Sequence, residues 1–450
     1  MNDSYNFIIP LIHLLFFSYL LYRRIKRGNS FFSLANIALL IWIISAVCSF
    51  VFLNSELRQY SNLQIFPAIF WCFLFYISIY PLLKNSTCKI SNISANDKLI
   101  KFLCVCYCLI TILPFIEVLI QFIPKVLSGG SSSLAESMAD IHDDRQEGEV
   151  IEVIHLSFIS VLCWKIINYS LLLPSFLFFY TLSKSKKIFP NSQMRRFIIF
   201  GFLLVFTTQV MYYFCNAQRS MIARLAVTII GAFVTFYHIY NQDLKKKMMK
   251  IMIICSTVFI LGLSYITFAR FMVALDRATA AHDKTIWGWT SLYLGEGLLN
   301  YNEYAWNMRC PTEGDVTMLY YKKALGYNRI VDDYHRRSFW AVRTGIPQNI
   351  FYTHIGAFVE DFTPLGAFFV LGIFSIIMLR ITRFRSNSTV SIEKIYILLF
   401  LFYIIANGYC YFSFGGLNKG GRILHELFIA LFFHFYRKYS YRPNIANNNK

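Results

Sequence analysis

The chain has 450 residues, of which 56% are hydrophobic, 18% are aromatic and 15% are charged, and its mean hydropathy is +0.49. An average soluble domain carries about 25% charged residues, so a water-soluble globular protein is excluded and the composition predicts a bilayer as the solvent. The formal charge of +19 would suit a nucleic-acid-binding protein, but its distribution along the chain excludes that class as well.

Apolar runs near the length needed to span a bilayer, about 20 residues, mark the helices expected to cross the membrane. We expect eleven of them, at residues 5–22, 31–53, 65–83, 99–123, 154–182, 197–215, 225–240, 251–268, 363–379, 395–411 and 423–435. An odd number of spans places the two termini on opposite sides. The sequence therefore predicts an all-α polytopic membrane protein.

Lysine and arginine cluster beside every second connection between these spans. The side that they mark holds 25 of the 43 basic residues and only three acidic ones, Asp97, Asp243 and Glu393. Positively charged connections stay in the cytoplasm, so the N-terminus is predicted to lie outside and the C-terminus inside. Topology then accounts for the whole basic excess, and no nucleic acid is expected as a partner.

Two outer segments are too long to be simple connections. Residues 124–152 are rich in Ser, Gly and acidic residues and suggest a mobile flap, whereas residues 269–362 are aromatic and suggest a folded or membrane-lying helical domain. We therefore divide the chain into spans 1–8 with the flap (1–268), a large outer loop (269–362) and spans 9–11 with the tail (363–450). Long loops are usually functional, so we expect any chemistry on the outer face.

Several arginines lie at the predicted outer ends of spans. Arg219 and Arg224 occupy a short outer hairpin, Arg270 follows the eighth span, and Arg422 precedes the eleventh. Arginines at span ends often only reach the lipid headgroups. Alternatively, they bind an anionic ligand at the membrane surface, and the sequence alone leaves both interpretations open.

The end of the outer loop carries a recognisable string of residues. Pro347-Gln348-Asn349-Ile350-Phe351 is followed, after a spacer, by Glu360-Asp361-Phe362 and an apolar helix. This string resembles the tail motif of the O-antigen polymerases, the Wzy-type oligosaccharide repeat unit polymerases. The turn Gln218-Arg219-Ser220 resembles the arginine turn that these enzymes share with O-antigen ligases.

The resemblance implies a ligase-like, glycosyltransferase-C-like fold in the inner membrane of a Gram-negative bacterium, with the large loop in the periplasm. It also implies a glycosyltransferase that moves an oligosaccharide from undecaprenyl diphosphate onto the next lipid-linked repeat unit. Such enzymes work among membrane lipids, and a chain-length regulator is a further partner to be considered. No metal or nucleotide cofactor is expected, because the chain has no Asp-x-Asp and no phosphate-cradling glycine loop.

The implied reaction needs cations for the diphosphate and a base for the acceptor hydroxyl. Arginine binds phosphate through a planar fork, and the candidate diphosphate ligands are Arg219, Arg270 and Arg343, followed by Arg224 and Arg422. The candidate bases are His354, Glu360 and Asp361, with His354 slightly preferred because an imidazole titrates near neutral pH. Asn349 and Gln348 are candidate substrate-positioning residues.

Two other functions stay open. An O-antigen ligase would transfer the finished glycan to the lipid A core, but the related ligases have a histidine where this chain has Gln348. A lipid-linked sugar flippase would be expected to show internal repeats and short loops on both sides. The sequence shows neither feature, which favours the polymerase.

Overall fold

The computed structural model describes most of the chain as helices with short connections. The described residues are 6–55, 58–85, 90–128, 154–170, 172–216, 218–254, 256–257, 264, 286–327, 333–347, 350–384, 388–415 and 417–440. Side chains at 125–128, 219, 286–290, 333–334, 417–418 and 440 are not described. Most of the predicted flap lies outside these ranges, as do Arg270, Gln348 and Asn349.

Among the described helices, seven are long and apolar enough to cross a membrane. They are α2 (Ile8–Lys26), α3 (Leu34–Leu53), α4 (Ile65–Lys84), α5 (Asp97–Ser128), α10 (Ser192–Cys215), α11 (Arg219–Phe236) with the 3-10 turn η2 (Tyr237–Ile239), and α16 (His354–Thr382). The helices α7 (Phe158–Tyr169) and α8 (Leu173–Ser183) meet at an angle of 69° and form an eighth span if they are counted together. The chain is therefore an all-α polytopic membrane protein, as its composition predicts.

The number of eleven spans and their orientation stay predictions. The predicted span at 251–268 lies largely outside the described residues. The predicted spans at 395–411 and 423–435 overlap α17 (Ile392–Ala406), which has only 15 residues, and α18 (Leu417–Ser440), which carries charged side chains along its length.

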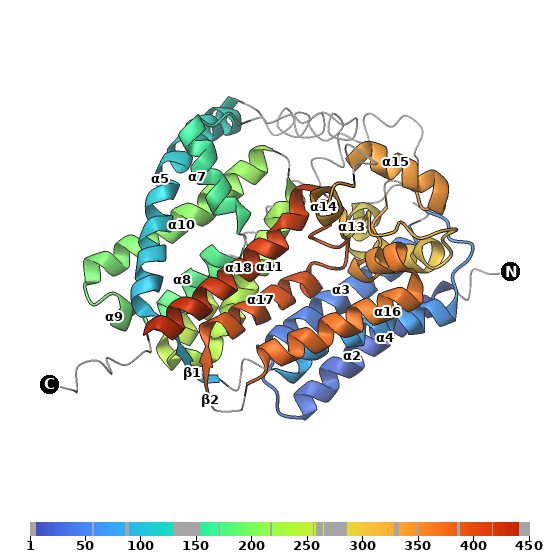
Figure 1. Ribbon diagram of the computed structural model, residues 1–450, viewed down its shortest axis with the longest axis horizontal. Coiled ribbons are helices and arrows are strands. Elements are labelled where there is room, and N and C mark those ends of the chain that lie inside the picture. Colours follow the sequence, from blue (N-terminus) through green and yellow to red (C-terminus); the bar gives the residue numbers. More distant parts are fainter. Residues whose placement is uncertain are drawn as a thin grey trace. The chain divides into compact units, whose positions relative to one another are not determined.

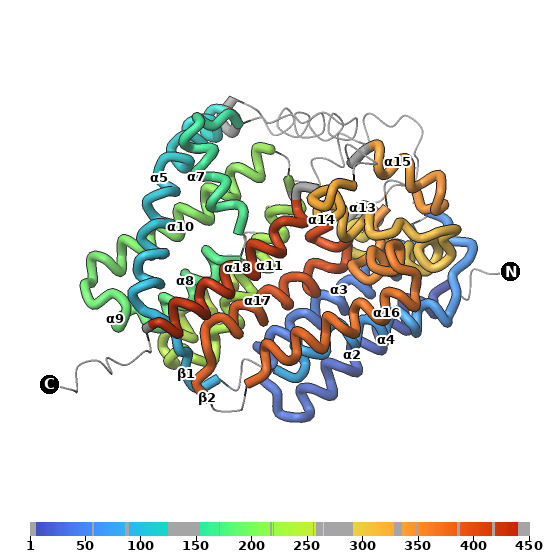
Figure 2. The backbone as a smooth tube through the Cα atoms, viewed as in Figure 1, coloured from blue at the N-terminus to red at the C-terminus, as the bar shows by residue number. Residues whose placement is uncertain are grey.

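The described residues divide into two compact units. Unit 1 comprises residues 1–89, 281–386 and 397–424. It contains α2, α3, α4, α13 (Ile286–Asn300), the π-helical turn η3 (Tyr301–Ala305), α14 (Leu319–Ala324), α15 (Asp333–Thr344), α16 and parts of α17 and α18. Figure 2 shows the blue N-terminal helices of this unit beside orange segments from far along the chain.

The helices of unit 1 pack around an aromatic core. α2, α3 and α4 contact one another, α16 packs on α4, and α13 packs on α3 (Figure 1). Trp42 and Trp71 are fully buried, with ring centroids 5.0 Å apart. Trp42 donates a hydrogen bond to the carbonyl of Ile405, and Trp71 donates one to the hydroxyl of Thr353. Trp42 thus ties α3 to α17, and Trp71 ties α4 to the residue that precedes α16.

Unit 2 comprises residues 90–280, 387–396 and 425–450. It contains β1 (Ile90–Ser94), α5, α7, α8, α9 (Ser185–Ile188), α10, α11, η2, β2 (Ser388–Ser391) and parts of α17 and α18. The strands β1 and β2 pair in parallel, which the sequence analysis did not anticipate. Units 1 and 2 combine segments that the three-part division of the sequence separates, and that division by topology stays a prediction.

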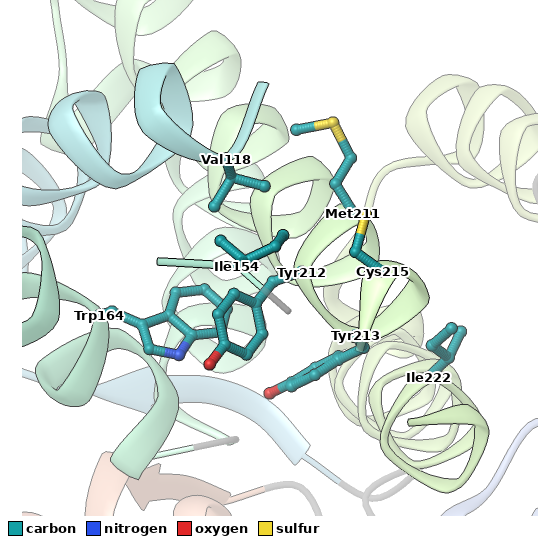
Figure 3. Close-up of a cluster of buried hydrophobic side chains, with 8 residues drawn as sticks. All are labelled: Val118, Ile154, Trp164, Met211, Tyr212, Tyr213, Cys215 and Ile222. Carbon is teal, nitrogen blue, oxygen red and sulfur yellow. The ribbon is translucent and has the colours of Figure 1, made fainter. Parts of the chain in front are cut away.

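Side-chain caps start several of these helices. Ser157 precedes α7 and accepts a hydrogen bond from the backbone of Ser160, and Asn191 does the same for Gln193 at the start of α10. Such caps bind N–H groups that have no partner inside the helix. Where α7, α5 and α10 meet, Trp164, Val118 and Tyr212 belong to a buried apolar cluster (Figure 3).

Candidate functional site

The candidate site lies in unit 1, where the second half of the tail motif, Glu360-Asp361-Phe362, lies in the first part of α16. The hydroxyl of Thr353 caps this helix by accepting a hydrogen bond from the N–H of Gly356. The helix is interrupted at Thr363, whose φ of 64° is not helical, immediately before Pro364. A proline disrupts a helix interior but suits its first turn, so α16 consists of a short segment with the motif and a long apolar segment. The apolar run at 363–379 predicts a helix only over the second segment.

His354 is buried in the aromatic core of unit 1. Its ring centroid lies 5.8 Å from that of Trp42, and its Nδ1 lies 3.3 Å from the carbonyl oxygen of Gly408. A carbonyl oxygen only accepts hydrogen bonds, so Nδ1 carries the proton and Nε2 is left as an acceptor. Nε2 has no hydrogen-bond partner among the described residues. The imidazole is thus enclosed by rings and not presented at a surface.

Asp361 is also buried, and its carboxylate is occupied by the loop at residues 312–317. Oδ1 accepts hydrogen bonds from the Thr312 hydroxyl and from the N–H groups of Gly314 (3.1 Å) and Val316 (3.0 Å). Oδ2 accepts from both the N–H (2.7 Å) and the hydroxyl (2.5 Å) of Thr317. Two carboxylate oxygens offer about four lone-pair sites, so little capacity remains for a substrate. Asp361 therefore acts as the anchor of this loop.

Glu360 is the candidate base with an available oxygen. Its side chain is buried, and Oε2 has no hydrogen-bond partner among the described residues. The side chains of Tyr352 and Arg336 lie close enough to this carboxyl group to interact with it. Its backbone carbonyl accepts from the N–H of Thr312 at 2.8 Å, which fixes the position of this helical turn.

Tyr352 and Arg336 complete the surroundings of Glu360, and the sequence analysis did not assign either a role. Burial and the neighbouring Glu360 carboxylate raise the pKa of Tyr352 well above its ordinary value, although Arg336 opposes this. The phenol therefore stays protonated at neutral pH. Both residues lie close in sequence to the tail motif, which is the only signal that would have indicated them.

Asp315 holds the other side of this region together. Its carboxylate accepts hydrogen bonds from the indole of Trp340 at 2.9 Å and from Lys322, and its carbonyl accepts from Arg336 at 3.2 Å. Trp340 and Arg336 are one helical turn apart on α15. The loop at 312–317 is thus fixed to α14 and α15 through Asp315 and to α16 through Asp361.

The candidate diphosphate ligands are distributed over both units. In unit 1, Arg343 is exposed at the end of α15, with its guanidinium 4.1 Å from the ring centroid of Phe339, and Arg422 is half-buried in α18. In unit 2, Arg224 is buried in α11, with a guanidinium nitrogen 3.8 Å from the sulfur of Met221. Arg219 begins α11, but its side chain lies outside the described residues, as does the whole of Arg270.

Within the described part of the chain, no group of three or more His, Cys, Asp or Glu residues is arranged to hold a metal ion. The described structure brings Glu360 together with Tyr352 and Arg336, and it assigns Asp361 to a loop. No family model, no curated protein and no solved structure matches this chain.

Proposed function

We propose that the protein polymerises lipid-linked oligosaccharide repeat units at the outer face of a bacterial inner membrane. The growing chain leaves undecaprenyl diphosphate and is transferred to the next lipid-linked unit. Four features support this proposal: the multi-pass architecture, the charge asymmetry of the connections, and the resemblance of the tail motif and of the arginine turn to those of O-antigen polymerases.

The observation that carries the proposal is the environment of Glu360. A base for an acceptor hydroxyl must have an oxygen that is not already bound, and it must be held in place. Asp361 already accepts hydrogen bonds from five donor groups. His354 also keeps a ring nitrogen without a partner in the described residues, but its imidazole is enclosed by aromatic rings. Glu360 keeps Oε2 without a partner in the described residues, its helical turn is held by the backbone bond from Thr312, and Tyr352 lies beside its carboxyl group. We therefore assign the role of base to Glu360.

In the proposed reaction, an acceptor hydroxyl attacks the anomeric carbon of the donor sugar and gives its proton to Glu360. The new carbon–oxygen bond is the glycosidic bond, and the bond that breaks joins the anomeric carbon to the diphosphate. The lipid diphosphate leaves with the electron pair of that bond. Its negative charge is balanced by arginine, for which Arg219, Arg270 and Arg343 are the first candidates and Arg224 and Arg422 the next.

The test is polymerisation by the purified protein in vesicles that contain a lipid-linked repeat unit. We expect Glu360→Gln to lower kcat by about 10²- to 10⁴-fold, the range for a lost general base, while donor binding is retained. His354→Gln is the matched control because it replaces another buried polar side chain near the start of the same helix. Normal chain growth by folded Glu360→Gln would contradict the assignment and return the role to His354 or Asp361.

A second arm of this assay separates the three classes of function. A polymerase extends the lipid-linked unit into a ladder, a ligase forms product only when lipid A core is supplied, and a flippase moves the lipid-linked unit across the vesicle without forming a bond. Gln348 in place of the ligase histidine favours the first outcome. With labelled donor and labelled acceptor, one vesicle preparation distinguishes the three functions.

The arginine turn has its own test. Arg219→Lys keeps the positive charge but loses the planar fork that binds phosphate at two points. We expect both Arg219→Lys and Arg219→Ala to shorten the polysaccharide ladder in cells at normal protein level. An unchanged ladder in both variants would remove Arg219 from the site.

A further inference from the structure

Two polar residues of α13 bind the backbone of Phe351, immediately before Tyr352. Oε1 of Glu296 accepts a hydrogen bond from the N–H of Phe351 at 3.1 Å, and Nδ2 of Asn300 donates one to its carbonyl oxygen at 2.8 Å. Residues four apart on a helix lie on the same face, which explains how one helix reaches both polar groups of one residue. Together they form a clamp on Phe351.

The clamp is buried and is connected to the segment between α3 and α4. Glu296 and Asn300 are 1% and 0% exposed. Arg58 lies 3.6 Å from Oε2 of Glu296 and donates to Oδ1 of Asn300 at 3.2 Å, and Tyr60 donates to the same oxygen at 2.9 Å. Burial raises the pKa of Glu296, against the opposing effect of Arg58. Burying a polar group costs free energy unless the group is hydrogen-bonded. The presence of Glu296 and Asn300 in this buried position therefore indicates a specific role.

α13 is held firmly where it carries the clamp. Ser45 and Ser49 of α3 donate hydrogen bonds to the carbonyls of Leu294 and Gly295, both at 2.6 Å. On the other side, a Cβ atom at Gly297 would lie 2.4 Å from the carbonyl oxygen of Tyr409 and 3.3 Å from the nitrogen of Thr353. Only glycine permits this approach. The helix therefore cannot shift without disturbing the residues around Phe351.

We propose that Glu296 and Asn300 are positioning residues that set the place of Tyr352 and, through its hydroxyl, of the Glu360 carboxylate. The backbone of Phe351 fixes where the next side chain starts, and that side chain, Tyr352, interacts with the Glu360 carboxyl group. This role rests on the proposed function, since it concerns the base of that reaction. A displacement of about 1 Å in such a group lowers turnover by about a hundredfold.

Two measurements on the full-length protein test the clamp, and the first does not depend on activity. Hydrogen exchange at the Phe351 amide reports whether its acceptor is present. The variants are Glu296→Ala, which removes the acceptor, Glu296→Gln, which keeps an oxygen in place but loses the ion pair with Arg58, and Glu303→Ala. Glu303 is a matched control because its carboxylate binds the N–H groups of Ser61 and Asn62 and not Phe351.

We expect Glu296→Ala to speed exchange at Phe351 by about tenfold, with Glu296→Gln and Glu303→Ala close to the wild type. The second measurement is the kcat and KM of polymerisation in vesicles. Glu296→Ala should lose about ten- to a hundredfold in kcat, with little change in KM for the lipid-linked acceptor. Glu296→Gln should recover most of this loss, which a general loss of stability would not explain.

The outcomes separate this inference from the proposed function. Unchanged exchange at Phe351 in Glu296→Ala would overturn the clamp, whatever the protein catalyses. Faster exchange with an unchanged kcat would show a clamp without a positioning role, and so would an equal loss of kcat in Glu303→Ala. If the wild type forms no polymer while exchange responds as expected, the proposed reaction fails, and with it the positioning role, while the clamp itself stands.

Discussion

Buried carboxylates have different structural roles in the two units. In unit 1, Glu296, Glu303 and Asp361 accept hydrogen bonds from the backbone N–H groups of segments far away in the sequence. In unit 2, the buried Glu426 accepts from the hydroxyls of Tyr396 and Ser170, which are side chains on α17 and next to α7. The first arrangement fixes loops, whereas the second joins helices.

The difference shows which interactions hold each unit in its fold. Lipid tails are as apolar as leucine, so helices in a membrane associate through packing and hydrogen bonds more than through the hydrophobic effect. Unit 2 uses packed rings for this, such as Trp164 against Tyr212 with centroids 4.3 Å apart (Figure 3). Unit 1 additionally orders irregular segments around α13 and α16, and these surround the proposed base. A reaction centre needs residues that packing and supporting hydrogen bonds hold in place.

The largest effect is expected for Asp361→Asn in unit 1. The substitution keeps the shape but turns an acceptor oxygen into an NH₂ donor that faces other donors. Each buried group left unsatisfied costs about 1–3 kcal/mol, and with several affected we expect a loss of about 4 kcal/mol. Thermal unfolding in detergent measures the loss, and amide exchange should rise first at residues 312–317. If the amides of residues 312–317 stay as protected from exchange in the variant as in the wild type, Asp361 does not anchor this loop.

The matched test in unit 2 is Trp164→Ala in the cluster of Figure 3. Removal of a buried tryptophan leaves a cavity and costs about 3 kcal/mol. Because Trp164 of α7 packs on Tyr212 and Tyr213 of α10, exchange should rise across α7 and α10 together. Trp164→Phe retains an aromatic ring and should lose less stability. A purely local response at one loop would contradict the contrast between the units.

The sequence predicted the helices better than the site. Apolar length alone placed most of the spans, and the predicted span at 363–379 starts where α16 is interrupted, at Thr363. The partners of Asp361 lie 44–49 residues away along the chain, and β1 and β2 are farther apart still. Side-chain to backbone bonds over such distances leave no periodic pattern, so neither the loop anchor nor the clamp on Phe351 was predictable. The aromatic enclosure of His354 was missed for the same reason.

A close contact between α5 and α10 gives a third test, in unit 2. A Cβ atom at Gly201 would lie 2.3 Å from Sγ and 2.6 Å from Cβ of Cys108. Gly201→Ala should therefore destabilise the protein by about 2 kcal/mol through overpacking. The double variant Gly201→Ala, Cys108→Gly removes the clash and should recover part of the loss in thermal unfolding. No recovery would mean that the two helices do not meet at this contact.

The smallest effect is expected for Glu393 in unit 2, which binds two side chains of α18. Its carboxylate accepts hydrogen bonds from Arg437, the shortest at 2.7 Å, and from His434 at 3.1 Å. Burial tends to raise the pKa of Glu393, but these bonds outweigh burial and hold the pKa below its ordinary value. A charge-assisted pair of this kind contributes about 1.5 kcal/mol, so Glu393→Gln should lose about that much at neutral pH.

The pH dependence of this loss is the sharper measurement. Because the folded-state pKa of Glu393 is depressed, its contribution is complete above the unfolded value of about 4.3 and disappears as the pH falls through the folded value. The difference in stability between the wild type and Glu393→Gln should therefore be constant near neutral pH. It should shrink as the pH falls below about 4. Asp97→Asn is the control, since its partner Lys187 is largely exposed and such pairs contribute little. A difference that persists at acidic pH would mean that the Glu393 carboxylate is not what holds α17 to α18.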